Sequence, residues 1–306
     1  MYDPFTIFHL PCQLPVAGNK IGRRGKCLVA NSLEEELWVR MASISKSIRN
    51  VAVFLVDGMR PDGLRLAHTP FMDEVLDQGA YTFHARSVMP TTTLPCHTSL
   101  FFSIPTDIHG IRENVWQTLP TPIPGLFDVI HQQGLTAAAF YNWEPLRDLS
   151  RPGSLAASCF LKDVPDDGGK SDREVSAFAL AWLQSHEWAF SFVYMHNTDK
   201  TGHRYGWMSD SYLTAISNAD RCIEQICRIL PEDTVVIVTS DHGGHDNTHH
   251  SDQEEDMTIP FMIYGPGIPK GQEIDGQVSI MDIAPTIVRF LGLEKPDGWM
   301  GKEICL

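Results

Sequence analysis

The chain of 306 residues is long enough for one large α/β domain, with or without a small appendage. Its formal net charge of -14 excludes a nucleic acid polymer as a generic partner, because no surplus of basic residues is present to neutralise phosphates. Seven cysteines without a Cys-x-x-Cys pair predict neither a disulfide framework nor a structural zinc knuckle. No apolar stretch approaches the roughly 20 residues of a membrane-spanning helix, so no membrane span is expected.

The N-terminal segment differs from the rest of the chain. Residues 1–46 show little periodicity apart from a short helical pattern over 33–41. They also lack the order of basic and apolar residues that marks a signal peptide. We predict a poorly structured extension over 1–46 and a main domain over 47–306, with Met41 as an alternative start. Scattered cysteines and no signal peptide favour a reducing, cytoplasmic location.

Uncharged runs predict strands with both faces buried, as in a parallel sheet. In chain order these runs cover 51–56, 135–140, 189–195, 234–239 and 259–264. Amphipathic or capped segments predict helices over 69–76, 125–133, 172–184, 210–229 and 282–291. The alternation predicts an α/β fold with a doubly wound, mainly parallel β-sheet flanked by helices. Residues 150–172 hold Gly, Pro, Ser and Asp without periodicity and are expected to form a surface excursion.

Acidic and histidine side chains follow three of the predicted strands. Asp57 follows the first strand, Asp199 and His203 follow the strand over 189–195, and Asp241 and His242 follow the strand over 234–239. Because open α/β sheets bind ligands at the carboxyl ends of their strands, we expect these side chains to meet at one edge of the sheet.

The segment 240–250 holds four histidines and two aspartates, and its last two residues, His249 and His250, are both candidates for the same site. A single loop histidine is more often incidental than functional, but a cluster of this density favours a metal site. In the segment that follows the strand over 189–195, Gly202 is expected to let the backbone turn between Asp199 and His203.

A hydroxyl-rich segment precedes another predicted helix. Thr93 is suited to be the N-cap of that helix, with Pro95 in its first turn and an apolar run over 100–102 behind it. A hydroxyl there lies where free backbone N–H groups and the helix dipole favour an anion. Simple capping is the commoner role of a Thr-x-Pro sequence, so this segment alone is weak support for a site. A polar loop over 108–114 follows.

The candidate ligands indicate a kind of metal. Carboxylates and imidazoles without a thiolate suit Zn²⁺ or Mn²⁺ better than Ca²⁺ or Mg²⁺, which prefer oxygen ligands alone. Six or seven such ligands exceed the need of one catalytic metal. Two metals about 4 Å apart serve displacement at phosphorus. The sequence therefore predicts two divalent metal ions, zinc first and manganese second.

Five short motifs occur in a characteristic order. They are Val56-Asp57-Gly58, Pro90-Thr91-Thr92-Thr93-Leu94-Pro95-Cys96-His97, His109-Gly110-Ile111-Arg112-Glu113-Asn114, Asp199-Lys200-Thr201-Gly202-His203 and Ser240-Asp241-His242-Gly243. Together, over residues 51–304, they resemble the type I phosphodiesterase/nucleotide pyrophosphatase family of the alkaline phosphatase superfamily. Each motif is short, but five in order, each after its expected strand or loop, are specific.

The resemblance implies an alkaline phosphatase-like catalytic domain and a small-molecule phosphate ester as substrate. It implies two metal sites, one on Asp199, His203 and a late histidine, for which His249 is preferred over His250, and the other on Asp57, Thr93, Asp241 and His242. The implied activity is hydrolysis of phosphate diesters, nucleotide-like or other, through a phosphothreonyl intermediate on Thr93. Asn114 and the backbone N–H groups after Thr93 are expected to bind the phosphate oxygens.

The chain departs from the family pattern at Thr198, where the family usually has proline. It is also shorter than the multidomain nucleotide pyrophosphatases. The resemblance therefore does not imply that the substrate is a nucleotide. A phosphate monoesterase is an alternative, in which Arg112 would neutralise the additional phosphate charge. A sulfatase is not expected, because the nucleophile position of a sulfatase holds Cys or Ser. The alternative from another class is a non-catalytic binding protein that retains the fold.

Overall fold

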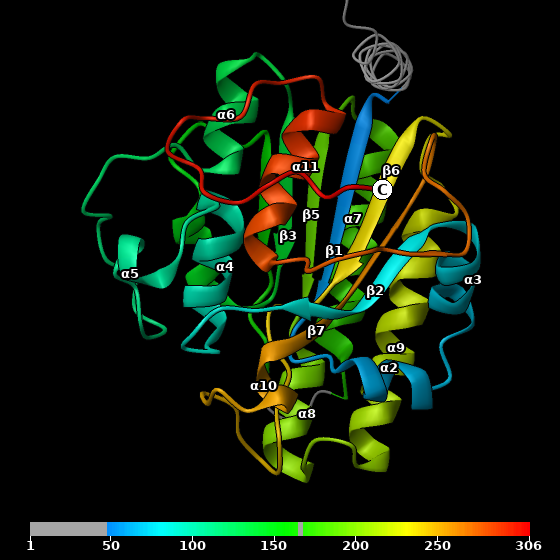
Figure 1. The fold of residues 1–306 in the computed structure, drawn as a ribbon. Coiled ribbons are helices and arrows are strands. Elements are labelled where there is room, and N and C mark those ends of the chain that lie inside the picture. The colour runs from blue at the N-terminus through cyan, green and yellow to red at the C-terminus, as the bar shows by residue number, and fades with distance from the viewer. Residues whose placement is uncertain (1–47, 165–167) are drawn as a thin grey trace, which may run out of the picture. The chain divides into compact units, whose positions relative to one another are not determined.

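The computed structural model describes residues 48–164 and 168–306. The predicted extension over 1–46 lies outside the described residues. Within those residues, the strands form one eight-stranded sheet in the order β4-β3-β5-β1-β6-β7-β2-β8 (Figure 1). The strands are β1 (Asn50–Val56), β2 (Ala80–Arg86), β3 (Ala137–Tyr141), β4 (Ala157–Phe160), β5 (Phe190–Met195), β6 (Thr234–Thr239), β7 (Thr258–Tyr264) and β8 (Gln272–Glu273).

The sheet is mainly parallel, as predicted. β4, β3, β5, β1 and β6 run parallel to one another, whereas β7 is antiparallel to both β6 and β2. The reversal at β7 follows from its connection. A parallel neighbour needs a crossover that returns the chain to the start of the sheet. The segment between β6 and β7 instead stays at the carboxyl edge and contains only the short helix α10 (Glu254–Met257).

Three strands, β2, β4 and β8, were not predicted from the sequence. The surface excursion expected over 150–172 contains β4, an edge strand whose residues alternate between half-buried and exposed. β2 was not predicted, because its sequence mixes polar and aromatic residues without a clean alternation. All three strands lie at or near an end of the sheet order, where a strand needs fewer apolar residues than at the centre.

Helices cover both faces of the sheet (Figure 1). On one face lie α4 (Thr93–Phe102), α6 (Leu126–Gln132) and α11 (Ile283–Phe290), and on the other lie α2 (Pro61–Leu66), α3 (Pro70–Gln78), α7 (Lys170–Ser185) and α9 (Asp210–Cys227). The remaining helical segments are α5 (Thr106–His109), α8 (Asn197–Tyr205), η1 (Glu144–Leu149) and η2 (Ile280–Asp282). The five predicted helices are confirmed, with ends that shift by a few residues. In the described part of the chain, no helix is both long and apolar enough to cross a bilayer.

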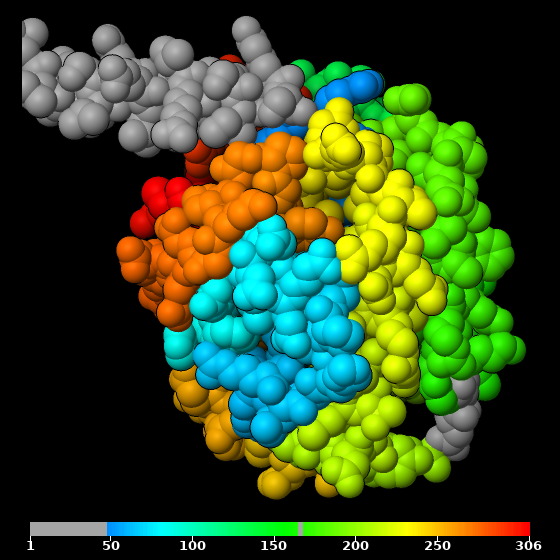
Figure 2. Space-filling model, turned by 90° about the vertical axis from the view of Figure 1, so that its right-hand side faces the viewer, coloured from blue at the N-terminus to red at the C-terminus, as the bar shows by residue number. Residues whose placement is uncertain are grey.

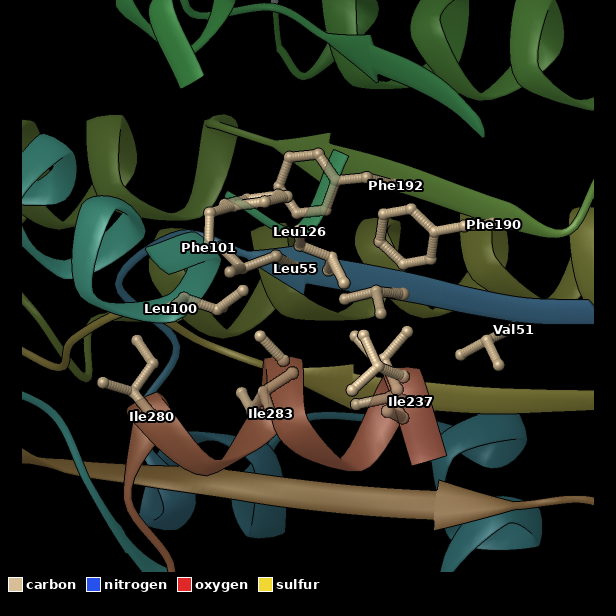
Figure 3. Close-up of a cluster of buried hydrophobic side chains, with 14 of the residues drawn as sticks. Val51, Leu55, Leu100, Phe101, Leu126, Phe190, Phe192, Ile237, Ile280 and Ile283 are labelled. Atoms are coloured by element: carbon tan, nitrogen blue, oxygen red, sulfur yellow. The ribbon is translucent and has the colours of Figure 1, made fainter. Parts of the chain in front are cut away.

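Each face of the sheet has its own hydrophobic core, since successive strand residues point to opposite faces. On β1, Val51 and Leu55 pack on the side of α4 and α11, while Ala52 and Phe54 pack on the side of α3 and α9. Figure 3 shows the first core, in which strand side chains meet the apolar residues of α4 and α11. Figure 2 shows the second face from outside, with the segment of α2 and α3 (blue to cyan) beside α9 (yellow-green).

Candidate active site

Three neighbouring strands deliver the predicted site residues. β5, β1 and β6 are adjacent in the sheet, and their carboxyl ends are nearly level, because Val56 pairs with Met195 and Leu55 pairs with Thr239. Asp57 follows β1 directly, Asp241 follows β6 after one residue, and Asp199 lies in the first turn of α8, the helix after β5. The expectation that these side chains meet at one edge of the sheet is therefore confirmed.

The first group of side chains contains Asp57, Asp241 and His242, all fully buried. The Nε2 atom of His242 lies 3.3 Å from Asp57 Oδ1 and 3.4 Å from Asp241 Oδ2. The hydroxyl of Thr93 joins this group, because its Oγ1 lies 3.4 Å from the same Nε2 atom. Nδ1 of His242 hydrogen-bonds to the carbonyl of Gly243, which leaves Nε2 to face the carboxylates.

The second group contains Asp199, His203 and His249. Asp199 Oδ1 lies 3.4 Å from His203 Nε2 and 3.5 Å from His249 Nε2, and the two ring nitrogens are 3.1 Å apart. His250 does not join them, because its Nδ1 hydrogen-bonds to Thr92 Oγ1 at 2.9 Å. Of the two candidate histidines, the fold thus brings His249 to the site.

The expected role of Gly202 was wrong. Asp199 and His203 lie one turn apart on α8, so a helix and not a turn brings them to the same face. Glycine is needed at 202 because a Cβ atom there would lie 2.6 Å from the ring of Trp207. Trp207 in turn packs edge-on against the ring of His203, with centroids 5.1 Å apart, and so supports one of the candidate ligands.

The environment of three buried carboxylate oxygens indicates whether a cation would fit here. Asp57 Oδ1, Asp199 Oδ1 and Asp241 Oδ2 have no hydrogen-bond partner in the described part of the chain. Buried polar atoms are nearly always paired, and a buried carboxylate without a partner is costly. Burial and the charges of Asp241 and Asp199 raise the pKa of Asp57 well above its usual value. A divalent cation between the carboxylates would remove this repulsion, so the residues present fit a metal.

His249 is in the form that binds metals. Burial and the neighbouring His242 lower the pKa of His249 to about 2, so its ring is neutral at ordinary pH. Its Nδ1 hydrogen-bonds to the carbonyl of Thr91, which leaves Nε2 to face Asp199. A neutral imidazole held through one nitrogen, with the other directed at the site, is the usual arrangement of a metal-ligating histidine.

The start of α4 differs from the prediction in two details. Thr92 is the N-cap, and Thr93 is the first helical residue. The backbone N–H groups after Thr93 are not free for phosphate: Leu94 N donates to Asn114 Oδ1 at 3.0 Å, Pro95 has no N–H, and Cys96 N donates to the carbonyl of Thr92. The first of these bonds fixes the orientation of the Asn114 amide, because Oδ1 faces Leu94 and the exposed Nδ2 donor faces away from it.

Two supporting residues beside these groups were weakly indicated or missed by sequence reasoning. Tyr194, the penultimate residue of β5, donates its hydroxyl hydrogen bond to Asp57 Oδ2 and leaves Oδ1 unpaired. His97 donates from Nδ1 to the carbonyl of Thr93 at 2.8 Å, and its ring is fully buried. A polar tyrosine in an otherwise apolar strand was the available signal for Tyr194, and it is too common to be specific.

A cavity of ≈ 650 Å³ lies beside the site, lined by Asn142, Trp143, Glu144, Pro145, Phe160, Lys162, Asp163, His196 and Lys200. His196 joins this cavity to the second group of candidate ligands, since its Nε2 lies 3.6 Å from Asp199 Oδ2 and its Nδ1 lies 3.0 Å from Asp163 Oδ2. Burial acts to lower the pKa of His196, but hydrogen bonds to these two carboxylates raise it to about 9. The cavity therefore combines aromatic walls with cationic groups at the edge of the site.

The family model of type I phosphodiesterase / nucleotide pyrophosphatase matches residues 51–258. The chain belongs to this family. The matched residues run from β1 to the start of β7 and include every predicted site residue from Asp57 to His249. The resemblance inferred from the five motifs is thereby confirmed.

The curated relatives of this chain are larger proteins. GPI ethanolamine phosphate transferase 1 of Neurospora crassa is 23% identical over 270 residues, which cover 75% of this chain and 26% of the relative. Phosphopentomutase of Clostridium kluyveri is 30% identical over 176 residues, which cover 58% of this chain and 42% of the relative. The chain thus matches less than half the length of each of these relatives.

Solved structures show the same fold. Murine ectonucleotide pyrophosphatase/phosphodiesterase 5, in an inactive form in complex with AMP, has a TM-score of 0.67 and 16% identity, over 84% of this chain and 97% of that chain. A 2-O GAG sulfatase has a TM-score of 0.68 and 16% identity, over 84% of this chain and 73% of that chain. Both solved structures share an alkaline phosphatase-like fold with this chain.

Proposed function

We propose that this chain is a metal-dependent phosphodiesterase or pyrophosphatase that hydrolyses small phosphate diesters with Thr93 as the nucleophile. The observation that carries the proposal is the convergence of one hydroxyl, three buried carboxylates and three histidines at the ends of three adjacent strands. A site that binds no cation has no reason to bury three carboxylate oxygens without partners.

The two residue groups would hold two divalent ions, zinc first and manganese second, one on Asp199, His203 and His249 and the other on Asp57, Asp241 and His242, with Thr93. When bound, such ions supply positive charge to the reacting phosphate and lower the pKa of a hydroxyl or a water. The donor set of carboxylates and imidazoles without thiolate supports this choice of metal.

The chain's own residues supply the rest of the chemistry. Thr93 Oγ1 forms a bond to phosphorus while the bond from phosphorus to the leaving alcohol oxygen breaks, and the hydroxyl proton of Thr93 ends on the departing alcohol. The product is a phosphothreonyl intermediate that keeps the second ester group. Water then displaces Thr93, and a phosphate monoester is released. Asn114 is oriented by Leu94 N so that Nδ2 can donate to a phosphate oxygen, where charge collects in the transition state.

A diester is preferred over a monoester because of Arg112. A monoester carries one more negative charge, and Arg112 was the candidate to neutralise it. Its guanidinium instead pairs with Asp107 at 2.5 Å, and 60% of the Arg112 side chain is exposed. The cavity walled by Trp143 and Phe160 offers room for the organic substituent that a diester has and a small monoester lacks. Binding of AMP by the murine relative supports a small phosphate ester as substrate.

Turnover of two chromogenic esters tests the proposal. Purified protein is assayed with bis-p-nitrophenyl phosphate and with p-nitrophenyl phosphate, before and after removal of metal by a chelator and after readdition of Zn²⁺ or Mn²⁺. We expect faster hydrolysis of the diester, loss of turnover on chelation and recovery with metal. Faster monoester turnover would assign the chain to the phosphatases. No turnover and no bound metal would favour the binding-protein alternative.

A further inference from the structure

The segment that carries His249 is tied to three separate parts of the fold. We call residues 245–251 the His249 loop. On one side, His249 Nδ1 and the backbone N–H of His250 contact Thr91, in the segment that leads to the nucleophile. On a second side, the carbonyl of Asn247 is 2.9 Å from His203 Nδ1, on α8. The third connection is to α10 and to Gln253, the residue before it, and the buried side chain in this connection is Asp256.

The carboxylate of Asp256 bridges the two ends of the His249 loop. Its Oδ1 accepts from Nδ1 of His245, the first residue of the loop, at 2.7 Å. Its Oδ2 accepts from the backbone N–H of Ser251, the last residue of the loop, at 2.9 Å, and from the Ser251 hydroxyl at 2.7 Å. Asp256 is fully buried, so these three hydrogen bonds are not exchanged with water.

The backbone of the same region depends on α10 as well. Gly243 N donates to the carbonyl of Asp256 at 2.8 Å, and Gly244 N donates to the carbonyl of Glu255 at 3.0 Å. The approach is so close that a Cβ atom at 243 would lie 1.9 Å from Glu255 O. α10 therefore supports both the residue that follows His242 and the loop that carries His249.

We propose that Asp256, with His245 and Ser251, is a positioning device that holds His249 at its metal site. Asp256 does not touch the reacting atoms; it closes the His249 loop at both ends and thereby sets where Nε2 of His249 lies. The inference rests on the proposed metal sites. Residues that orient metal ligands typically change metal affinity about 10- to 100-fold when they are replaced.

Zinc titration of the metal-free protein against a competing chelator tests the proposal. The variants are Asp256→Asn and His245→Ala, with His249→Ala to identify the binding step that belongs to this site. In Asp256→Asn an amide N–H group replaces one acceptor oxygen, so one end of the loop loses its partner. We expect affinity at the His249 step to fall about 10- to 100-fold in both variants, with the other step unchanged.

Two controls separate positioning from general stability. His245→Asn retains an N–H donor near the position of Nδ1 and should recover most of the lost zinc affinity. Asp220→Asn alters another buried aspartate, which accepts from Phe71 N and Met72 N away from the site, and should lower the unfolding midpoint without changing zinc affinity. His245→Ala changes a half-buried side chain, so the test remains decisive even if Asp256→Asn fails to fold.

Equal weakening of both zinc steps, or unchanged affinity in folded Asp256→Asn or His245→Ala, would overturn the positioning role while the proposed function stands. Wild-type protein that binds no zinc would overturn the metal sites themselves and the positioning role with them.

Discussion

Thr93 and His242 meet across the site, with Oγ1 of the threonine 3.4 Å from Nε2 of the histidine, although 149 residues separate them in the chain. Thr93 is the first residue of α4, and His242 lies in the segment after β6. Their meeting joins the candidate nucleophile to one of the two candidate metal sites.

Replacing Thr93 by alanine should abolish diester turnover. The variant loses the oxygen that bonds to phosphorus, and loss of a nucleophile typically costs about 10³-fold or more in kcat. Steady-state hydrolysis of bis-p-nitrophenyl phosphate measures the effect. Thr92→Ala is the matched control, because Thr92 is the adjacent N-cap and its hydroxyl bonds to His250 instead. Full turnover in Thr93→Ala would remove Thr93 from the mechanism.

The two adjacent histidines should differ in their effect on metal content. His249→Ala removes a ring nitrogen that lies 3.5 Å from Asp199 Oδ1, so about one metal per chain should be lost. His250→Ala should retain both metals, since its ring bonds to Thr92. Elemental analysis of the purified variants measures the difference. The reverse pattern would assign the ligand to His250.

Tyr194→Phe should destabilise the metal-free protein. The change removes the hydroxyl donor to Asp57 Oδ2 and leaves a second oxygen of that buried carboxylate without a partner. Such a loss costs about 1–3 kcal/mol of the free energy of unfolding. Urea denaturation of metal-free wild type and variant measures the cost. A variant as stable as wild type would show that this hydrogen bond contributes nothing net.

Stability should fall as the pH drops from about 6.5 to about 4, in part through His109. Burial and the charge of Arg112 lower the pKa of His109 to about 4. Between these pH values the unfolded chain binds a proton that the folded chain rejects, so the free energy of unfolding decreases as pH falls. In the folded chain both ring nitrogens of His109 already have partners, because Nδ1 accepts a hydrogen bond from Ile111 N and Nε2 bonds to the hydroxyl of Ser99.

Denaturation midpoints measured from pH 7 to pH 4 test this assignment. His109→Gln cannot take up the proton and should show a shallower fall with pH than wild type, even if its midpoint at pH 7 is lower. Parallel pH profiles in the two proteins would place the titration on other groups.

Arg112→Ala should leave hydrolysis of both test esters within about threefold of wild type, which is less than 1 kcal/mol of barrier. The reason is that Arg112 is exposed and paired with Asp107. Comparison of kcat/KM for the diester and the monoester checks this expectation. A selective loss of monoester turnover would show that Arg112 turns toward the substrate and would favour the monoesterase alternative.

Much of the site was predictable because its residues follow strands that can be recognised locally. β1, β5 and β6 are uncharged runs rich in β-branched or aromatic residues, and each is followed within a few positions by an acid. Parallel strands that alternate with helices bring such acids to one edge of a sheet, whatever the order of the strands. Asp57, Asp199 and Asp241 could therefore be placed together before any pairing was known.

The sequence by itself determined the α/β class, the central strands, the five motifs in order and the residues that meet, because local periodicity and short motifs encode these. Tertiary structure decided the reversal of β7, the pairing of β4 at the sheet edge and the helix that presents Asp199 and His203. It also placed the ring of His249, and not that of His250, beside Asp199 and His203, and it brought Asp256 into contact with both ends of the His249 loop. These features depend on contacts between residues that are distant in the chain. Local sequence patterns carry no information on the free energies of such contacts.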